Sequence, residues 1–469
     1  MSRFERGLSI GHTTLNSHEN DNATPVVTLN YVGPDHRLPL PYPEGDWYLR
    51  GTAVPAARPG EIVITNTLIP GLLDYYRKVG LVTEGTDIME VEPGRDYGFP
   101  HTDPLETLGG QVELQNGVSP LSLVSTFSSN LVDEQERILG LQSLARPDSA
   151  LTNDKARFRE AASNYGVRML PGTVLSDWGQ FAEVEDEYAG AAHGVWLKAP
   201  TGSGGDLVHH IPTVTRKNLL AGQRSIRDIV ATSFEAGEFD VSATEYWSPD
   251  KVAPQGSQLV IESDARNFGK IKTNGSTQFV TTRSGRTDII GHFEQITTEE
   301  GEYLGNRPYR PVFEEQQEIV DQVKRVGNMS RDEGYYGIQG VDWFVVETPS
   351  GDEVVYITER NTRPTANTPP VIIGEKVGAK EWINTNAYTD RPIDTIEDYI
   401  EVVGEDLAFG DPQIDGLVVP QAFRTLVSRQ ETRPSPDFKI LILGNNAAHC
   451  DTIAEKLRGR GIRFSPDAE

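Results

Sequence analysis

The sequence contains a single cysteine, Cys450, among its 469 residues. An internal disulfide and a zinc site built on several cysteines of one chain are therefore both excluded. No run of about 18 apolar residues is present, and the N-terminus lacks the apolar core of an export signal. We therefore expect neither a membrane-spanning segment nor secretion, and we expect a protein of the reducing cytoplasm.

Basic residues are also scarce, since 43 Lys and Arg stand against 69 Asp and Glu and give a net charge of −26. A surface of this charge repels phosphate backbones and anionic lipid head groups, so neither a nucleic acid nor a membrane is expected as a partner. Hydrophobic residues make up 37% of the chain, which is enough to form packed cores. At roughly 150 residues per domain, the length predicts about three units.

Strand-like and helix-like patterns alternate along the chain and predict an α/β (α+β) fold. Asn274-Gly275 and Ser284-Gly285 are typical of tight turns and divide a long β-rich stretch. We expect an N-terminal tail or edge element (1–45), a small Rossmann-like α/β domain (46–150), a unit with a glycine-rich loop (151–235), a β-rich unit with an acidic hairpin (236–385), and a C-terminal unit ending in a strand and a helix (386–469).

The acidic hairpin, Gly340–Asn361, is the most informative segment. If its turn centres on Ser350-Gly351, the numbers of paired residues sum to 701 and Asp342 lies opposite Glu359. Because side chains alternate between faces, Asn361 shares their face. The same register pairs Phe344 with Ile357 and Val346 with Val355.

Two carboxylates placed opposite each other repel, which predicts a cation between Asp342 and Glu359. Two carboxylates and the carbonyl of Asn361, without His or Cys, are ligands that suit Mg²⁺, which keeps coordination sites for water and substrate phosphates. The alternative is that these are ordinary polar residues at a sheet edge.

A second polar segment places Lys198 at the end of a strand and a glycine-rich loop directly after it. Backbone N–H groups of such a loop can approach an anion closely. The spacing fits neither a Walker A loop, whose lysine follows its glycines, nor a Rossmann fingerprint. Taken alone, such a loop is more often a flexible hairpin, and a lone lysine such as Lys198 is usually a surface residue. With Lys155 upstream and the acidic hairpin downstream, the set predicts a phosphate site facing a metal site. The loop comprises Thr201, Gly202, Ser203, Gly204, Gly205 and Asp206.

In this order the segments resemble the ATP-grasp superfamily, over about residues 151–375. The resemblance rests on Asn153-Asp-Lys155, Trp196-Leu-Lys198 with its loop, Leu259-Val-Ile-Glu262, Val341-Asp342 and Glu359-Arg-Asn-Thr-Arg363. The small α/β domain before residue 151 is similar to the domain that usually precedes an ATP-grasp core. Among known groups, the arrangement is most similar to the pheganomycin-type peptide ligases.

The resemblance implies a role for each matched residue. Lys155 and Lys198 would hold the α and β phosphates of ATP, Thr201–Asp206 would close over the γ phosphate, Glu262 would meet adenine and Asp264 the ribose. Asp342, Glu359 and Asn361 would bind Mg²⁺, and Arg363 would stabilise negative charge on the acyl phosphate. One departure is Gln339-Gly340, which stands where D-alanine ligases carry an oxyanion-binding arginine.

The expected activity is ligation of a carboxylate to an amine, with ATP consumed to ADP and phosphate, and the expected substrates are amino acids or short peptides. A phosphotransferase that acts on a hydroxyl and a nucleotide-binding protein without turnover are the alternatives. The number of subunits is open, with a homodimer as one option. Four arginines in the β-rich stretch are candidates for anchoring a substrate carboxylate: Arg266, Arg283, Arg286 and Arg310.

Overall fold

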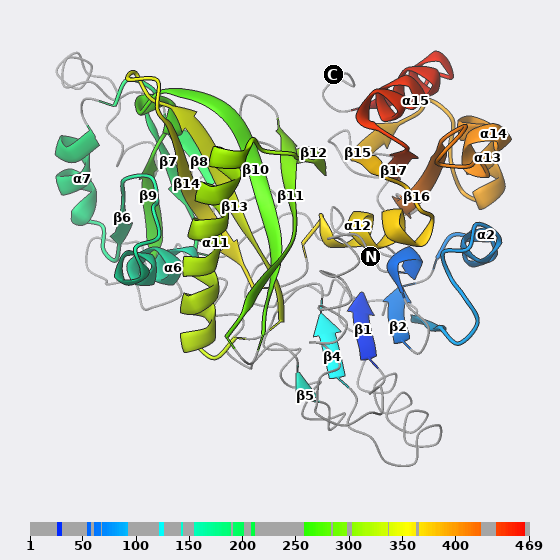
Figure 1. Cartoon of the computed structure of the whole chain (residues 1–469), viewed down its shortest axis with the longest axis horizontal. Helices are drawn as coiled ribbons and strands as arrows, with labels where there is room; N and C mark the ends of the chain where they lie inside the picture. The colour runs from blue at the N-terminus through cyan, green and yellow to red at the C-terminus, as the bar shows by residue number, and fades with distance from the viewer. Residues whose placement is uncertain are drawn as a thin grey trace.

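The fold is described from a computed structural model of the chain. It describes residues 26–30, 54–57, 61–66, 68–91, 122–125, 142–143, 154–188, 191–200, 208–211, 258–282, 285–297, 303–335, 337–362, 365–423 and 438–464. Three sheets organise these residues: one parallel sheet near the N-terminus and two antiparallel sheets (Figure 1).

The N-terminal sheet has five parallel strands in the order β3-β2-β1-β4-β5. The stretch expected to be a tail or an edge element therefore contributes β1, which lies at the centre of this sheet rather than at its edge. The elements of this part are β1 (Val26–Asn30), the short helix η2 (Val54–Ala56), β2 (Glu61–Asn66), α2 (Leu72–Lys78), β3 (Asp87–Val91), β4 (Ser122–Ser125) and β5 (Gln142–Ser143).

A four-stranded antiparallel sheet follows, in the order β6-β9-β7-β8. One of its faces packs against α7 through a cluster that includes Phe181, Leu197 and Ile261. Its other face carries Lys198 and Glu262. The elements are α6 (Lys155–Ala162), η3 (Ser163–Tyr165), β6 (Gly172–Leu175), α7 (Gln180–Tyr188), β7 (Val195–Lys198), β8 (Val208–Ile211), β9 (Leu259–Ser263) and η4 (Ala265–Asn267).

The largest sheet has nine strands and runs in the order β14-β13-β10-β11-β12-β15-β17-β16, with β18 paired to β15. Helix α11 lies across its first strands (Figure 1) and buries Ile319, Val323 and Val326 against Trp343 and Ile357. Its elements begin with β10 (Lys270–Thr281), β11 (Thr287–Thr297), β12 (Tyr303–Pro308), α11 (Phe313–Asp332), β13 (Gly337–Glu347) and β14 (Glu353–Asn361). This layering leaves the opposite face of the first strands to form a site.

The C-terminal part continues the same sheet, and the boundary expected between 385 and 386 falls within β15. The strand and helix predicted near the end are present as β17 and α15, where burial raises the pKa of Cys450 to about 12. The elements are α12 (Thr368–Lys376), β15 (Glu381–Tyr388), α13 (Ile396–Val403), α14 (Glu405–Ala408), β16 (Leu417–Phe423), β17 (Phe438–Gly444), α15 (Ala447–Gly459) and β18 (Arg463–Phe464).

One of the two predicted turns is wrong. Asn274-Gly275 lies inside the twelve-residue strand β10, and a side chain at Gly275 would collide with the ring of Trp343, 2.3 Å from the nearest ring atom. This glycine therefore makes room for a buried tryptophan instead of forming a turn. The second turn is confirmed at Gly285, whose φ of 84° suits a glycine and whose N–H bonds to the carbonyl of Thr282.

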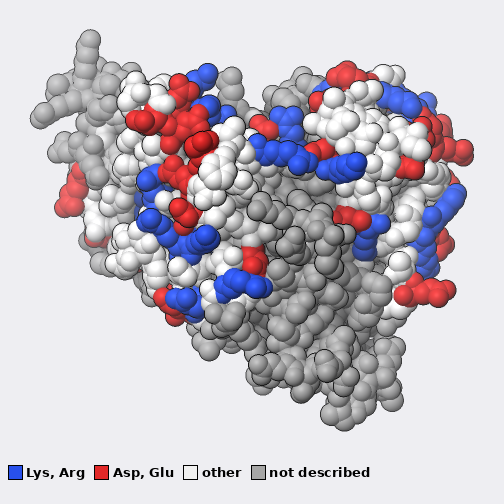
Figure 2. Space-filling view, in the orientation of Figure 1, with Lys and Arg blue, Asp and Glu red and all other residues white. Residues whose placement is uncertain are grey.

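No described helix has the length and apolar character needed to span a bilayer. Acidic and basic side chains are interspersed on the face shown in Figure 2. The excess of acidic residues is therefore not gathered into one patch over the described part of this face.

Candidate functional site

The hairpin β13–β14 places its two carboxylates as predicted. Asp342 is paired with Glu359 across the two strands, and Asn361 is paired with Gly340. The Nδ2 of Asn361 donates to Oδ2 of Asp342 at 3.3 Å, and the Nε2 of Gln295 donates to Oδ1 of the same aspartate at 3.0 Å. Oxygen-bearing side chains thus gather on the face of the sheet opposite α11.

The remaining pairs of the predicted register are wrong by one residue. Trp343 lies opposite Ile357, and Phe344 lies opposite Tyr356, because the turn centres on Ser350 and these pairs sum to 700. Thr358 is an extra residue in β14, and this bulge restores the sum of 701 at Asp342 and Glu359. The bulge therefore keeps the two carboxylates on one face while Ile357 faces the core under α11.

Lys155 connects helix α6 to this acidic hairpin. Asp154 caps the helix by accepting the N–H groups of Ala156 and Arg157, so α6 begins at Lys155. The side chain of Lys155 is 6% exposed, and its Nζ lies 3.5 Å from Oε2 of Glu359. The structure thus brings the first predicted phosphate-binding lysine to a predicted metal ligand.

Lys198 lies in a second ionic cluster with the buried carboxylate of Glu262. Both Lys198 and Arg159 form ion pairs with Glu262, one to each carboxylate oxygen. Arg159 follows Lys155 by four residues, so both side chains leave the same face of α6. Helix α6 therefore bridges the two antiparallel sheets, with Lys155 contacting the large one and Arg159 the small one. Sequence reasoning missed Arg159, although its helical spacing from Lys155 was the available signal.

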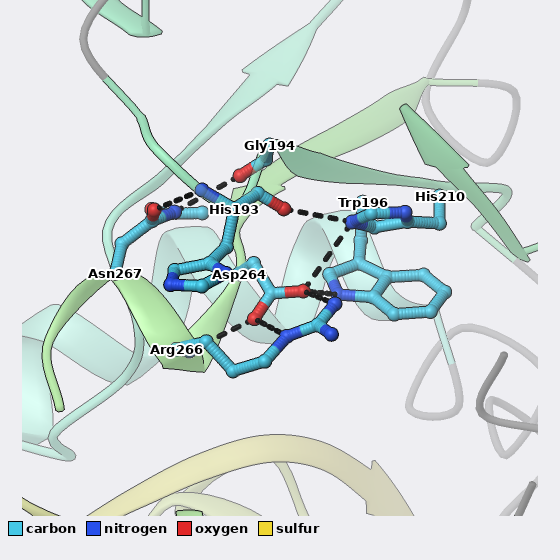
Figure 3. A network of polar contacts seen from close by, with 8 residues as sticks. His193, Gly194, Trp196, His210, Asp264, Arg266 and Asn267 are labelled. Carbon is cyan, nitrogen blue, oxygen red and sulfur yellow. Dashed lines mark hydrogen bonds and ion pairs between the residues drawn. The ribbon is translucent and has the colours of Figure 1, made fainter. Parts of the chain in front are cut away.

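Asp264, which follows β9, is held in a network of its own (Figure 3). Arg266 contacts both carboxylate oxygens at 2.9 and 2.7 Å, and the indole Nε1 of Trp196 donates to Oδ2 at 3.0 Å. Burial raises the pKa of Asp264, but these donors outweigh it and hold the pKa below its usual value. The ring of His210 lies against Trp196, with centroids 4.7 Å apart. A ribose contact by Asp264 would have to share these oxygens, and it stays a prediction.

Several predicted site residues lie outside the described residues, namely Thr201–Asp206 and Arg363. Gln339 is buried beneath α11, where it bonds to Ser330 and Thr281, so it does not reach the site. Within the described ranges, no three His, Cys, Asp or Glu side chains gather as metal ligands. The predicted metal site does not form such a group, because it has two carboxylates and its third ligand is the amide of Asn361.

Comparison with known proteins gives a match in structure and none in sequence. No protein-family model and no curated protein matches the chain. A biotin carboxylase from Campylobacter jejuni superposes with a TM-score of 0.55 at 12% identity, over 94% of this chain and 92% of its own. An N5-carboxyaminoimidazole ribonucleotide synthetase in complex with ADP gives 0.52 at 13% identity, over 93% and 96%.

A third match is the Staphylococcus aureus N5-carboxyaminoimidazole synthetase complexed with ADP, with a TM-score of 0.52 at 11% identity, over 93% of this chain and 98% of that one. The chain has the ATP-grasp fold. The fold class predicted from the sequence is therefore confirmed. The division of the core into two subdomains, at 151–235 and 236–385, stays a prediction.

Proposed function

We propose that this chain is an ATP-dependent carboxylate–amine ligase that joins amino acids or short peptides and releases ADP and phosphate. A carboxylate would attack the γ phosphate of ATP, and an amine would then displace phosphate from the resulting acyl phosphate. The choice of peptide substrates follows from the resemblance of the sequence to the pheganomycin-type peptide ligases. Amide formation and the peptide substrates are part of this proposal.

One observation carries the proposal: α6 joins the predicted metal ligands to the predicted nucleotide residues. Lys155 approaches Glu359 on one sheet, and four residues later Arg159 pairs with Glu262, which also binds Lys198 on the other sheet. A cluster of cations beside paired carboxylates is suited to a nucleotide triphosphate and its divalent ion. An ordinary polar sheet edge does not require the buried Lys155 or the half-buried Lys198.

The structurally similar proteins support the nucleotide part of the proposal. The Aspergillus clavatus N5-carboxyaminoimidazole synthase was crystallised with ADP and 5-aminoimidazole ribonucleotide, and the Hydrogenobacter thermophilus biotin carboxylase domain with MgADP and bicarbonate. We therefore assign ATP and Mg²⁺ to this chain as well.

Each predicted site residue would have a separate role in binding or catalysis, set by its position. Asp342, Glu359 and Asn361 would hold Mg²⁺, which screens the charge of the phosphates when bound. Lys155 and Lys198 would bind and orient the α and β phosphates, releasing part of their present contacts with Glu359 and Glu262. Thr201–Asp206 would exclude water from the γ phosphate, and Arg363 would stabilise charge on the acyl group.

The reaction class is tested by measuring phosphate release over a panel of amino acid pairs and dipeptides with ATP and Mg²⁺. Hydroxylamine is then added in place of the amine. An acyl hydroxamate formed with the active acid supports the ligase, because only an activated carboxylate yields it. Phosphate transferred to a hydroxyl, with no hydroxamate, would establish the phosphotransferase instead.

The metal assignment predicts that Glu359→Gln lowers kcat by at least about a hundredfold, the scale of losing one charge-stabilising group. The substitution keeps the size of the side chain and removes one ligand charge. Glu353→Gln is the matched control, because Glu353 lies on the same strand in a surface ion pair with Lys272. Near-normal turnover of the Glu359 variant with Mg²⁺ would refute the assignment.

A further inference from the structure

The buried carboxylate of Glu262, on β9, pairs with two cations. Lys198 contacts its Oε1 and Arg159 its Oε2. The side chain of Glu262 is 2% exposed, and those of Lys198 and Arg159 are 13% and 10% exposed. Because one carboxylate carries one negative charge, it leaves one of these two positive charges uncompensated. A positive charge with so little access to water is normally paired or bound to a ligand.

The next carboxylate along the chain does not supply the missing charge. Asp264, two residues beyond Glu262, already has Arg266 as its counterion. The other arginines that the sequence suggested as carboxylate anchors also have carboxylates of their own where the structure describes them: Arg286 pairs with Asp288, and Arg310 with Glu381. Arg283 lies outside the described residues. Arg159 differs from these arginines because it shares its carboxylate with a lysine.

Arg159 is fixed in place by more than its ion pair. Its Nη1 donates to the carbonyl of Leu170 at 2.8 Å. Gly172 lies opposite Glu262 in the pairing of β6 with β9, and a Cβ added to this glycine would come within 2.7 Å of the same Nη1. The glycine therefore leaves the space that the guanidinium fills beside the carboxylate. The carbonyl and this space hold Arg159 on Glu262 whether or not Lys198 is there.

Lys198 has no such additional support within the described part of the chain, where its polar contact is with Glu262. It is the last residue of β7 and comes three residues before the predicted phosphate loop at Thr201. A lysine side chain is a flexible stem that ends in a compact charge, whereas an arginine presents a rigid fork of donors. Of the two cations on Glu262, Lys198 is therefore the one that can turn to a ligand.

We propose that Arg159 compensates the charge of Glu262 and thereby frees Lys198 to bind a phosphate group of the nucleotide. This deepens the function proposed above and rests on it for the nucleotide. When Lys198 turns to a phosphate, Arg159 stays on Oε2 and the buried carboxylate keeps a counterion. Without Arg159, the same movement would leave Glu262 buried and unpaired, which is costly, so Lys198 would be held back. Arg159 is therefore a positioning residue that acts through Glu262.

The test is a double-mutant cycle in which calorimetry measures the affinity of the full chain for ADP with Mg²⁺. Arg159→Gln removes the charge and keeps a hydrogen-bonding side chain, and it should weaken ADP binding at least about tenfold. In a Glu262→Gln background, no buried anion competes for Lys198, so the same substitution should weaken binding less than about threefold. Arg159→Lys should bind ADP more tightly than Arg159→Gln, because it keeps the charge.

Arg168→Gln is the matched control, since Arg168 pairs with Glu318 in a more exposed ion pair, and this variant should bind ADP as the wild type does. Arg159→Met provides a second uncharged variant if Arg159→Gln does not fold. An unchanged ADP affinity would overturn the proposal, and so would an equal loss in both backgrounds, which a purely structural role of Arg159 produces. Because the titration involves no ligation, its outcome is independent of the phosphate-release and hydroxamate assays. A wild type that does not bind ADP would instead refute the nucleotide function itself.

Discussion

At the scale of single residues, the two predicted metal ligands Glu359 and Asn361 flank a fully buried arginine. Nη1 of Arg360 lies 2.6 Å from Oε2 of Glu333, at the end of α11, and its guanidinium lies over the ring of Phe158. Burial lowers the pKa of Arg360, against the opposing effect of Glu333. Because its neighbours in sequence point to the site, Arg360 fixes β14 from the opposite face and is a positioning residue.

Glu333→Gln should destabilise the protein by about 3 kcal/mol, because it removes the negative charge that pairs with the buried guanidinium of Arg360. Urea unfolding followed by tryptophan fluorescence measures the change. The double variant Arg360→Met with Glu333→Gln should recover most of the loss, since it removes both charges. A Glu333 variant as stable as the wild type would show that this ion pair does not hold β14.

Lys439 gives a pH dependence whose sign follows from its lowered pKa. The folded protein loses this proton near pH 8, whereas an unfolded lysine keeps it to about 10.5. The unfolded state binds more protons in this window, so the free energy of unfolding should rise between about pH 8 and 10.5. In chloride buffer, the rise should exceed that of Lys439→Met by up to about 3 kcal/mol. Parallel profiles for the two proteins would contradict the lowered pKa.

At the scale of elements, the packing of β10 against Trp343 depends on Gly275, a residue that the sequence pattern wrongly assigns to a turn. Gly275 faces the fully buried Trp343, whose Nε1 donates to Oγ1 of Thr277 at 2.9 Å. Gly275→Ala should therefore cost about 1 to 3 kcal/mol of stability, because the ring must shift in a packed core. Gly459→Ala, in α15 with no atom near the added carbon, should be neutral or stabilising. Urea unfolding of both variants checks this, and equal effects would refute the packing argument.

The hairpin β13–β14 shows how far the sequence predicts the pairing of strands. Alternation correctly placed Asp342 opposite Glu359, although the assumed turn was displaced by half a residue and the bulge at Thr358 compensated for it. Neither the position of the turn nor the bulge has a signal in the local sequence, because both depend on how the strands pair in the folded chain. The turn predicted at Asn274-Gly275 is wrong for a similar reason. A glycine that makes room for a tryptophan distant in sequence looks the same, in the sequence alone, as a glycine in a turn.

At the scale of the whole molecule, the N-terminal part is tied to the C-terminal sheet by buried hydroxyl groups. Tyr75 donates to the carbonyls of Ala408 and Val418, and Tyr76 donates to the carbonyl of Pro420 at 2.7 Å. Lys376 of α12 binds the carbonyls of Pro55, Ala57 and Leu81. The sequence predicted strands, helices and their order here, but it could not predict these contacts, because they join residues more than 290 positions apart.

The central claim is that the two antiparallel sheets, joined by α6, hold one divalent cation beside a nucleotide. The most direct test is anomalous diffraction from crystals grown with Mn²⁺ and ADP. The account predicts a manganese peak within roughly 2.5 Å of carboxylate oxygens of both Asp342 and Glu359, with the phosphates of ADP between Lys155 and Lys198. A peak bound elsewhere, or nucleotide bound with neither carboxylate at the metal, would contradict it.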